Sequence, residues 1–339
     1  MSATLPSPAL SLRAVALYLC LLVGAGLTWY VLSGPAPSKN EATRAVVIKP
    51  QTGAFDIART LKEAHVIRSR VAFLAVAVVR RTHRHLLAGE YEFVAGLSLL
   101  EIVRRLEQGK GLVHQATIPE GFAARQIAEL LQEKGLVDQD RFMGLLRDHR
   151  LLQQYRVDGE SLEGYLFPDT YRLVKGLNEE AIIGRMVQRF AEVFGPAEQA
   201  RARELKMSVA EVMTIASLIE REAMADEERP LISAVFHNRL QLGMPLQSDP
   251  TVLYSLSRFS GKLTKANLQT PSPYNTYLHR GLPPGPIASP GRASIMAALY
   301  PASSRYLYFV SKNDGTHAFS NTLREHDAMV RRYQIRRVG

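Results

Sequence analysis

The hydrophobic pattern of the chain begins with one long uncharged stretch at residues 14–32. At about 1.5 Å per residue, a helix of this length reaches roughly 28 Å, close to the hydrocarbon thickness of a bilayer. A cleaved signal peptide is the alternative, although its apolar core usually has only about 7–15 residues. We expect a transmembrane helix at 14–32, preceded by a short segment at 1–13 and followed by a polar linker at 33–45.

The charge around this stretch predicts its orientation. Arg13 is the only charged residue that precedes it. Positive charge next to a membrane span tends to stay in the cytoplasm, so residues 1–13 are expected there. The rest of the chain is then expected on the outer side of the membrane.

A strand–turn–helix pattern recurs in the part that follows. Segments 46–67, 91–110 and 116–137 each begin with a short run typical of strands, pass through a turn and continue with apolar residues at helical spacing. The pattern is typical of small wall-binding modules, and 91–110 looks like a LysM repeat. Common α+β building blocks are the alternative. We predict a LysM-like subdomain over 46–111.

Between the first two of these segments lies a run of nine apolar residues, 71–79. It is too short to span a bilayer. We predict a buried helix there, or one that lies near the membrane. The densest basic cluster of the sequence, residues 80–85, follows directly.

From residue 112 onward the pattern becomes mainly helical, and we predict a larger mixed α+β catalytic domain over 112–339. Helical spacing occurs at 123–134, 140–149, 179–193, 197–206, 209–224 and 229–242. Beyond residue 245 the chain is rich in Pro, Gly, Ser, Asn and Tyr, and long polar loops of this kind usually line a site. A hairpin is expected at 306–320, with its turn at Asn313-Asp314-Gly315.

Composition narrows the possible partners and chemistry. The net charge is +10, but an exported domain rarely meets nucleic acid, so anionic lipid or an anionic wall polymer is the better candidate partner. A solvated basic face with no partner is the alternative. The only cysteine, Cys20, lies in the uncharged stretch, which excludes disulfides, cysteine metal clusters and thiol catalysis from the rest of the chain.

The helix expected at 209–224 carries two candidate acids. Ser208 and Glu211 form a capping-box pattern, so the helix should begin near residue 209. At about 100° per residue, Glu220 falls within the apolar stripe, whereas Glu222 falls on the opposite side and reads as a surface charge. A carboxyl on a buried face either meets a distant cation or holds a proton more tightly, as a general acid must. Glu220 is therefore the candidate general acid, and an ion pair with a distant arginine such as Arg239 is the alternative.

The polar loops after this helix supply candidate sugar-binding groups. Their hydroxyls, amides and carboxylates can bond sugar hydroxyls and acetamides, and their aromatic rings can stack on sugar rings. The alternative for each residue is a turn-forming or capping role. The candidates are Gln247, Ser248, Asp249, Tyr254, Asn275 and Tyr277.

Several of these segments together resemble one family. The matching stretches, in order, are 118–131, 161–171, 215–223, 235–254, 272–291, 308–310 and 314–320. With the N-terminal apolar stretch, the ordered set resembles the membrane-anchored endolytic murein transglycosylases of the YceG-like family. This resemblance implies a single-pass protein of the bacterial inner membrane that acts on peptidoglycan beside the synthases and terminates nascent glycan strands.

The resemblance also implies a reaction. The bond between N-acetylmuramic acid and N-acetylglucosamine is cleaved without water, which leaves a 1,6-anhydro end, and no metal or cofactor takes part. The family's catalytic glutamate is taken as the first of the Glu-Arg-Glu pair, Glu220. Glu163, in the segment 161–171, is expected to line the cleft or brace its floor. A hydrolytic muramidase that uses Glu163 or Asp249 as second carboxylate, and a non-catalytic wall-binding scaffold, are the alternatives.

Overall fold

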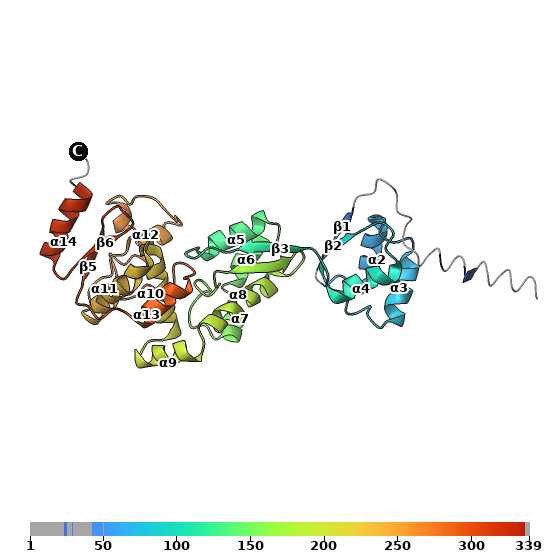
Figure 1. Cartoon of the computed structure of the whole chain (residues 1–339), viewed down its shortest axis with the longest axis horizontal. Helices are drawn as coiled ribbons and strands as arrows, with labels where there is room; N and C mark the ends of the chain where they lie inside the picture. Colours follow the sequence, from blue (N-terminus) through green and yellow to red (C-terminus); the bar gives the residue numbers. More distant parts are fainter. Residues whose placement is uncertain (1–23, 26–28, 30–42, 50, 336–339) are drawn as a thin grey trace, which may run out of the picture. The chain divides into compact units, whose positions relative to one another are not determined.

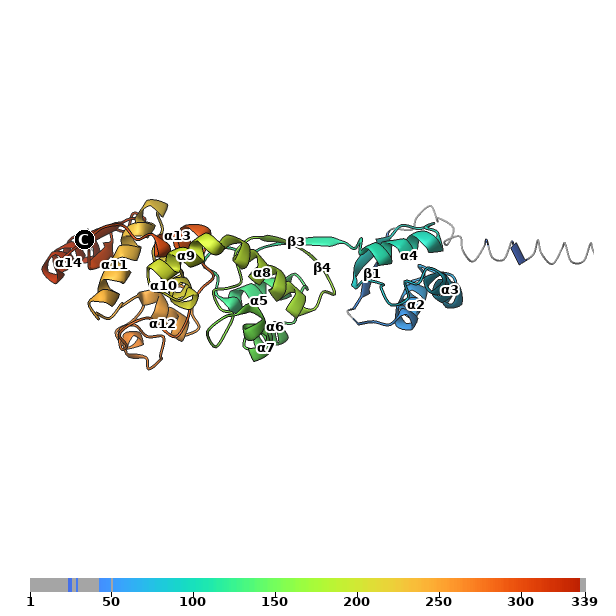
Figure 2. The same cartoon turned by 90° about the horizontal axis from the view of Figure 1, so that it is seen from below.

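The computed structural model describes residues 24, 25, 29, 43–49 and 51–335 (Figures 1 and 2). The transmembrane helix predicted at 14–32 lies outside these residues, except for Gly24, Ala25 and Trp29. None of the helices within the described residues combines the length and the apolar character needed to cross a bilayer.

The described chain forms two compact units. One contains the described residues up to His114 together with Leu173–Leu177, and the other contains Gln115–Arg172 and the described residues from Asn178 onward. Each unit has its own cluster of buried apolar side chains.

The first unit is built on two antiparallel strands and three helices. Strands β1 (Arg44–Ile48) and β2 (Gly89–Phe93) pair so that Arg44 lies opposite Phe93 and Ile48 opposite Gly89. Alternate residues of both strands point into the core, as the period of two requires. The core is completed by apolar residues of α2 (Ala54–Glu63), α3 (Arg70–Val79) and α4 (Leu99–Gln108).

Helix α3 corrects one sequence expectation. Residues 71–79 do form a helix, but only Phe73 and Ala77 are buried in it. Val71, Val78 and Val79 are 76%, 57% and 83% exposed. The prediction of a buried helix is therefore wrong for one face, because the small core of this unit covers only the other.

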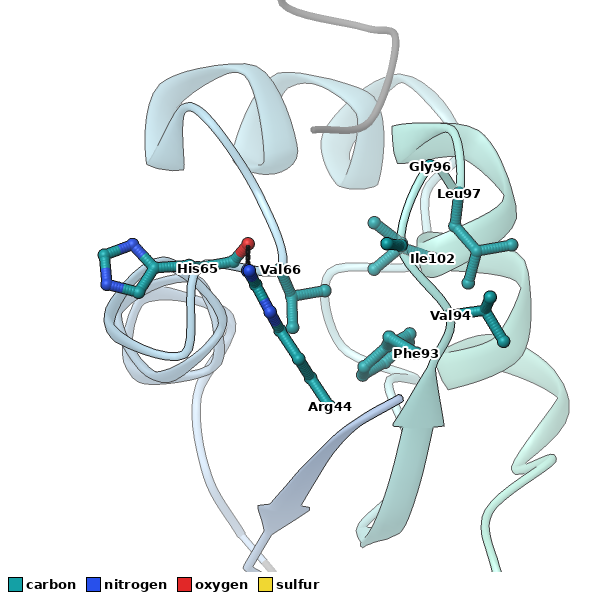
Figure 3. Close-up of a pocket in the computed structure, with 9 residues that line it drawn as sticks. Arg44, His65, Val66, Phe93, Val94, Gly96, Leu97 and Ile102 are labelled. Atoms are coloured by element: carbon teal, nitrogen blue, oxygen red, sulfur yellow. Dashed lines mark hydrogen bonds between the residues drawn. The ribbon is translucent and has the colours of Figure 1, made fainter. Parts of the chain in front are cut away.

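A small hollow lies at the end of β2 in the first unit (Figure 3). The Arg44 guanidinium crosses it and donates to the backbone carbonyl of His65. Val66, Phe93 and Ile102 form its apolar walls. Its volume of about 10 Å³ leaves room for about one water molecule and none for a sugar ring.

The second unit is mostly helical. Strands β3 (Val113–Thr117) and β4 (Thr170–Val174) are each divided between the two units. The other strands and α-helices of the second unit, in chain order, are α5 (Ala124–Glu133), α6 (Gln139–Leu145), α7 (His149–Tyr155), α8 (Glu179–Val193), α9 (Pro196–Glu204), α10 (Val209–Glu222), α11 (Arg229–Gln241), α12 (Asp249–Ser255), α13 (Arg292–Leu299), β5 (Tyr308–Ser311), β6 (His317–Ser320) and α14 (Leu323–Val330). Strands β3 and β4 pair with each other, and β5 and β6 form the predicted hairpin.

Helix α10 lies at the centre of this unit. It contacts α9, α11, α12 and α13, and in both views it lies between α12 and α13 (Figures 1 and 2). Every residue from 212 to 219 is buried. Its start matches the sequence prediction, because Ser208 Oγ accepts from the Glu211 N–H while the Glu211 carboxylate accepts from the Ser208 N–H.

Most predicted elements are confirmed. The helices at α5, α8, α9, α10 and α11 begin and end within two residues of the predicted bounds. The helix predicted at 140–149 is instead divided between α6 and α7, because Asp148 accepts from the Arg150 N–H and caps a new helix. The mixed α+β class is confirmed.

Candidate active site

A cleft of about 600 Å³ opens in the second unit, a volume within the usual range for small-ligand sites. Its walls come from the end of α10, from α11, from the loop before α12 and from the hairpin and α14. The titratable side chains that line it are Glu222, Arg239, Asp249, Tyr277, Tyr308, His317, His326 and Asp327.

Glu222 extends from the last turn of α10 into this cleft. The Ser248 hydroxyl donates to its Oε1 at 2.6 Å. Burial raises the pKa of Glu222 to about 7; the Ser248 hydrogen bond opposes this shift, and the Asp249 charge adds to it. The sequence interpretation of Glu222 as a surface charge is therefore wrong, because the loop before α12 covers the side of α10 on which it lies.

Two further predicted residues are joined in the same cleft. The Tyr277 hydroxyl donates to Asp249 Oδ1 at 2.6 Å. Burial, together with that hydrogen bond, raises the pKa of Tyr277, so the phenol keeps its proton and remains the donor. The pair holds the Asp249 carboxylate in a fixed direction beside Glu222.

Gln247 completes the group of predicted residues around Glu222. It is exposed in the cleft and has a left-handed backbone, with φ of 49°. Its N–H donates to the Thr276 carbonyl at 3.1 Å, which holds the loop before α12 against the loop that carries Tyr277. Among the predicted site residues, Gln247, Ser248, Asp249 and Tyr277 thus meet at Glu222.

Asn275 has a different environment from the one predicted. It is fully buried, and its Nδ2 donates to the backbone carbonyls of Leu268 and Thr270 at 3.1 and 2.9 Å. Its Oδ1 accepts from the Tyr277 N–H at 3.0 Å. The side-chain amide therefore shapes the loop that presents Tyr277 to the cleft.

Glu163 and Tyr254 lie together at another place in the unit. Glu163 is 6% exposed; its Oε1 accepts from the Ala124 N–H at 2.9 Å, and its Oε2 accepts from the Tyr254 hydroxyl at 3.2 Å. Burial raises the pKa of Glu163 to about 7, although both hydrogen bonds oppose the shift. The Tyr254 ring packs on Tyr274 with centroids 4.9 Å apart. Neither Glu163 nor Tyr254 is among the residues that line the 600 Å³ cleft.

Glu220 occupies a side of α10 outside that cleft. Its Oε2 accepts from the Gly291 N–H at 3.0 Å and lies 3.4 Å from Nη1 of Arg229. The Glu220 side chain is only 7% exposed. The ion-pair alternative from the sequence therefore has a partner, but that partner is Arg229 and not Arg239.

Arg239 is instead part of the cleft. Its guanidinium donates to the backbone carbonyls of Leu246 and Leu307 at 2.7 and 2.6 Å, and it lies over the Tyr308 ring at 5.1 Å. It thereby joins the end of α11 to the loop before α12 and to the hairpin.

A histidine–glutamate pair in the cleft wall was not singled out from the sequence. His317 Nδ1 lies 2.7 Å from Glu228 Oε2, and the His317 N–H donates to Glu228 Oε1 at 2.8 Å. These bonds fix the start of β6 to the segment before α11. The signal available was the histidine within the segment 314–320.

Comparison with known proteins gives consistent matches along the chain. Residues 46–332 match the YceG-like family. A Bacillus subtilis (strain 168) protein named endolytic murein transglycosylase is 33% identical over 329 residues, which cover 92% of this chain and 91% of that protein. A Streptococcus pneumoniae (serotype 2, strain D39) protein of the same name is 29% identical over 335 residues, which cover 89% of this chain and 60% of that protein.

A solved structure agrees with these matches. A crystal structure of a YceG-like protein from Listeria monocytogenes has a TM-score of 0.59 and 33% sequence identity to this chain. The alignment covers 85% of this chain and 98% of that one. The family match spans both compact units, and the chain therefore belongs to the YceG-like family.

Proposed function

We propose that this protein is an endolytic peptidoglycan lytic transglycosylase, a carbon–oxygen lyase. It cleaves the β-1,4 bond between N-acetylmuramic acid and N-acetylglucosamine within glycan strands and leaves 1,6-anhydro ends. Its relatives named endolytic murein transglycosylase support the reaction class. The observation that carries the proposal is a glutamate with a pKa near 7, Glu222, in a cleft large enough for sugar residues.

The geometry favours Glu222 over Glu220 as the proton donor. A general acid must hold its proton near the working pH and must reach the substrate. Glu222 lines the cleft, and its pKa of about 7 leaves a large fraction protonated at neutral pH. Glu220 lies outside the cleft lining, with Arg229 and a backbone N–H as partners. Glu220, to which the family resemblance points, stays the alternative proton donor.

The proposed chemistry needs one carboxyl. Glu222 donates its proton to the glycosidic oxygen as the bond from that oxygen to C1 of the muramyl residue breaks. The ionised Glu222 then accepts the proton of the muramyl C6 hydroxyl, whose oxygen attacks C1 and closes the 1,6-anhydro ring. The carboxyl is protonated again at the end, and no water is consumed. Such acid–base catalysis contributes about 100- to 10,000-fold.

The neighbours of Glu222 suit the charges that develop. The Asp249 carboxylate, held by Tyr277, can stabilise the positive charge on the oxocarbenium-like sugar. The Ser248 hydroxyl orients the Glu222 carboxylate. We propose that Gln247 and Tyr277 bond the sugar hydroxyls or acetamides, while Asn275 acts through Tyr277 as a positioning residue.

A matched pair of variants tests the assignment. Purified peptidoglycan is digested with the wild-type chain, with Glu222→Gln and with Glu220→Gln, and the new ends are resolved by mass spectrometry. Anhydro ends should fall at least about 100-fold in Glu222→Gln, while Glu220→Gln, in which the amide oxygen still accepts from Gly291, should keep most of its activity. Thermal unfolding checks that both variants fold.

Three other outcomes of the digestion would support a different catalytic residue or a different function. A folded, inactive Glu220→Gln beside an active Glu222→Gln would restore the assignment made from the sequence. Reducing ends in place of anhydro ends would indicate a muramidase in which Asp249 or Glu163 supplies the second carboxylate. No cleavage by the wild-type chain would favour a wall-binding scaffold.

The proposal also covers the cellular location of the protein and its division into domains. We propose a single-pass anchor at 14–32 in the bacterial inner membrane, with 1–13 in the cytoplasm. The linker predicted at 33–45 is shortened to 33–43, because β1 begins at Arg44. The LysM-like subdomain at 46–111 and the catalytic domain at 112–339 then face the wall, near the peptidoglycan synthases. The uncharged stretch supports the anchor, and the separate core formed by β1, β2 and the helices α2, α3 and α4 supports an N-terminal module. Fractionation of the chain with and without residues 1–32 tests the anchor.

A further inference from the structure

Helix α3 of the first unit exposes an apolar face. Val71, Ala75, Val78 and Val79 lie at positions i, i+4, i+7 and i+8, which share one side of a helix. All four are exposed, and the three valines are 57–83% exposed. Phe73 and Ala77 point into the core on the other side. A contiguous apolar face in water usually marks a contact surface.

The segment around this face carries positive charge only. Between Glu63 and Glu90 the sequence has no acidic residue, and it has five arginines and three histidines. Arg70 is exposed at the start of α3, and Arg81 and Arg84 are exposed just after its end.

Acidic groups from the neighbouring elements reach only part of this segment. On α4, Glu107 pairs with Arg80, with 2.7 Å between Arg80 Nε and Glu107 Oε1. On α2, Asp56 pairs with Arg59 at 2.7 Å. The described ion pairs include none for Arg70, Arg81 or Arg84, so these three guanidinium groups face solvent at the two ends of the apolar face.

We propose that the α3 surface, defined as Val71, Ala75, Val78 and Val79 with Arg70, Arg81 and Arg84, docks on an anionic lipid bilayer. A helix that lies in the interface buries an apolar face in the headgroup region and places cations beside lipid phosphates. The short residues on α3 suit shallow insertion. An anionic wall polymer could pair with the arginines, but it would leave the apolar valine side chains exposed to water.

The position of this surface along the chain makes the docking reachable. The linker residues 33–43 span at most roughly 40 Å when fully extended, so the anchor keeps the first unit near the bilayer. Tethering turns a weak interfacial contact into an intramolecular one. This inference rests on the proposed anchor at 14–32, and it adds that the first unit lies with α3 against the membrane.

A single fluorophore on the full-length chain tests the contact. Cys20 is the only cysteine, so a Cys20→Ser chain with Val78→Cys carries an environment-sensitive dye at one place. The chain is reconstituted into vesicles of neutral phosphatidylcholine, with or without anionic phosphatidylglycerol. The matched control is Leu242→Cys in the same background, an exposed apolar residue of the second unit with 62% exposure.

The expected result is a blue shift of the Val78→Cys dye and its quenching by spin-labelled lipid, in anionic vesicles only. Arg81→Ala with Arg84→Ala should lower the docked-to-free ratio about 25-fold, since each cation near an anionic surface contributes roughly fivefold. The dye at position 242 should stay in water. Circular dichroism of each labelled chain confirms folding.

Three results would overturn the inference. If the chain floats with the vesicles but the dye stays in water, the anchor is present and α3 does not contact the lipid. The α3 surface would then bind a protein partner. A shift that follows the protein-to-lipid ratio and not lipid charge would indicate a second copy of the chain. A chain that floats with neither vesicle would remove the anchor and this docking together, whereas peptidoglycan cleavage would still report on the proposed activity.

Discussion

Replacing Glu163 by Gln should make the protein more stable at high pH. Glu163 is 6% exposed, and burial raises its pKa from 4.5 to about 7. In the folded state it therefore keeps a proton that the unfolded chain releases above about pH 4.5. Stability contributed by this group is lost as the pH rises from the unfolded pKa to the folded one, and the loss is complete above about pH 7.

The size of the effect follows from the shift. A difference of about 2.5 pH units corresponds to roughly 3 kcal/mol at 1.36 kcal/mol per unit. Glu163→Gln removes the titration but keeps an oxygen for the Ala124 N–H, and its amide can donate to the Tyr254 oxygen. The stability of the variant relative to the wild type should thus improve by about 2–3 kcal/mol between pH 5 and pH 8.

Urea unfolding at several pH values between 5 and 8 measures this change. Glu160→Gln, in the same loop but exposed, is the matched control, and its curve should run parallel to that of the wild type. The reasoning is refuted if the Glu163→Gln curve is also parallel to the wild type, because Glu163 would then be ionised in the folded state. The reasoning is also refuted if the variant becomes less stable relative to the wild type as the pH rises.

Further predictions concern the cleft and its supports. Activity should fall as the pH rises through the pKa of Glu222, about 7, and Ser248→Ala, which removes a hydrogen bond that lowers this pKa, should move the fall to higher pH in a pH–rate profile. Gly291→Ala should change the stability by at most about 0.5 kcal/mol in a melting experiment, because its Cβ would meet only the carboxylate end of the exposed Glu120 side chain, which can move away. Gly144→Ala, with no atom within 4 Å of its Cβ, should cost nothing or stabilise by up to about 1 kcal/mol. Asn275→Ala should lower kcat/KM at least about tenfold in peptidoglycan digestion, with the pH profile unmoved, because it releases the loop that carries the cleft tyrosine.

Elements with local causes could be predicted from the sequence. The start of α10 depends on reciprocal bonds between Ser208 and Glu211, which are three residues apart. The hairpin β5–β6 depends on a turn at 313–315, where Asn313 adopts the left-handed φ of 61° that its side chain tolerates. Such features need few contacts with the rest of the chain, so residue type and spacing suffice.

The position of Glu222 could not be predicted in this way. A helical projection assumes that one side of a helix is buried and the other meets solvent. Helix α10 breaks this assumption, because α9, α11, α12 and α13 contact it and residues 212–219 are all buried. The side that carries Glu222 faces a cleft built from the loop at 245–249 and from the hairpin. These segments are distant in the sequence, so the residues of α10 alone do not predict that they cover this side.

Burial of a carboxyl does not by itself identify the catalytic general acid of this protein. Glu163 has a pKa of about 7, but it is bonded to the Ala124 N–H and the Tyr254 hydroxyl and lies outside the lining of the 600 Å³ cleft. The Glu220 side chain is only 7% exposed, and it lies beside Arg229 and the Gly291 N–H, outside the lining of the cleft. Glu222 combines a pKa near 7 with a place in the cleft. Its two cationic neighbours, Arg221 and Arg239, both donate to backbone carbonyls, so the carboxyl can give up a proton and take one back.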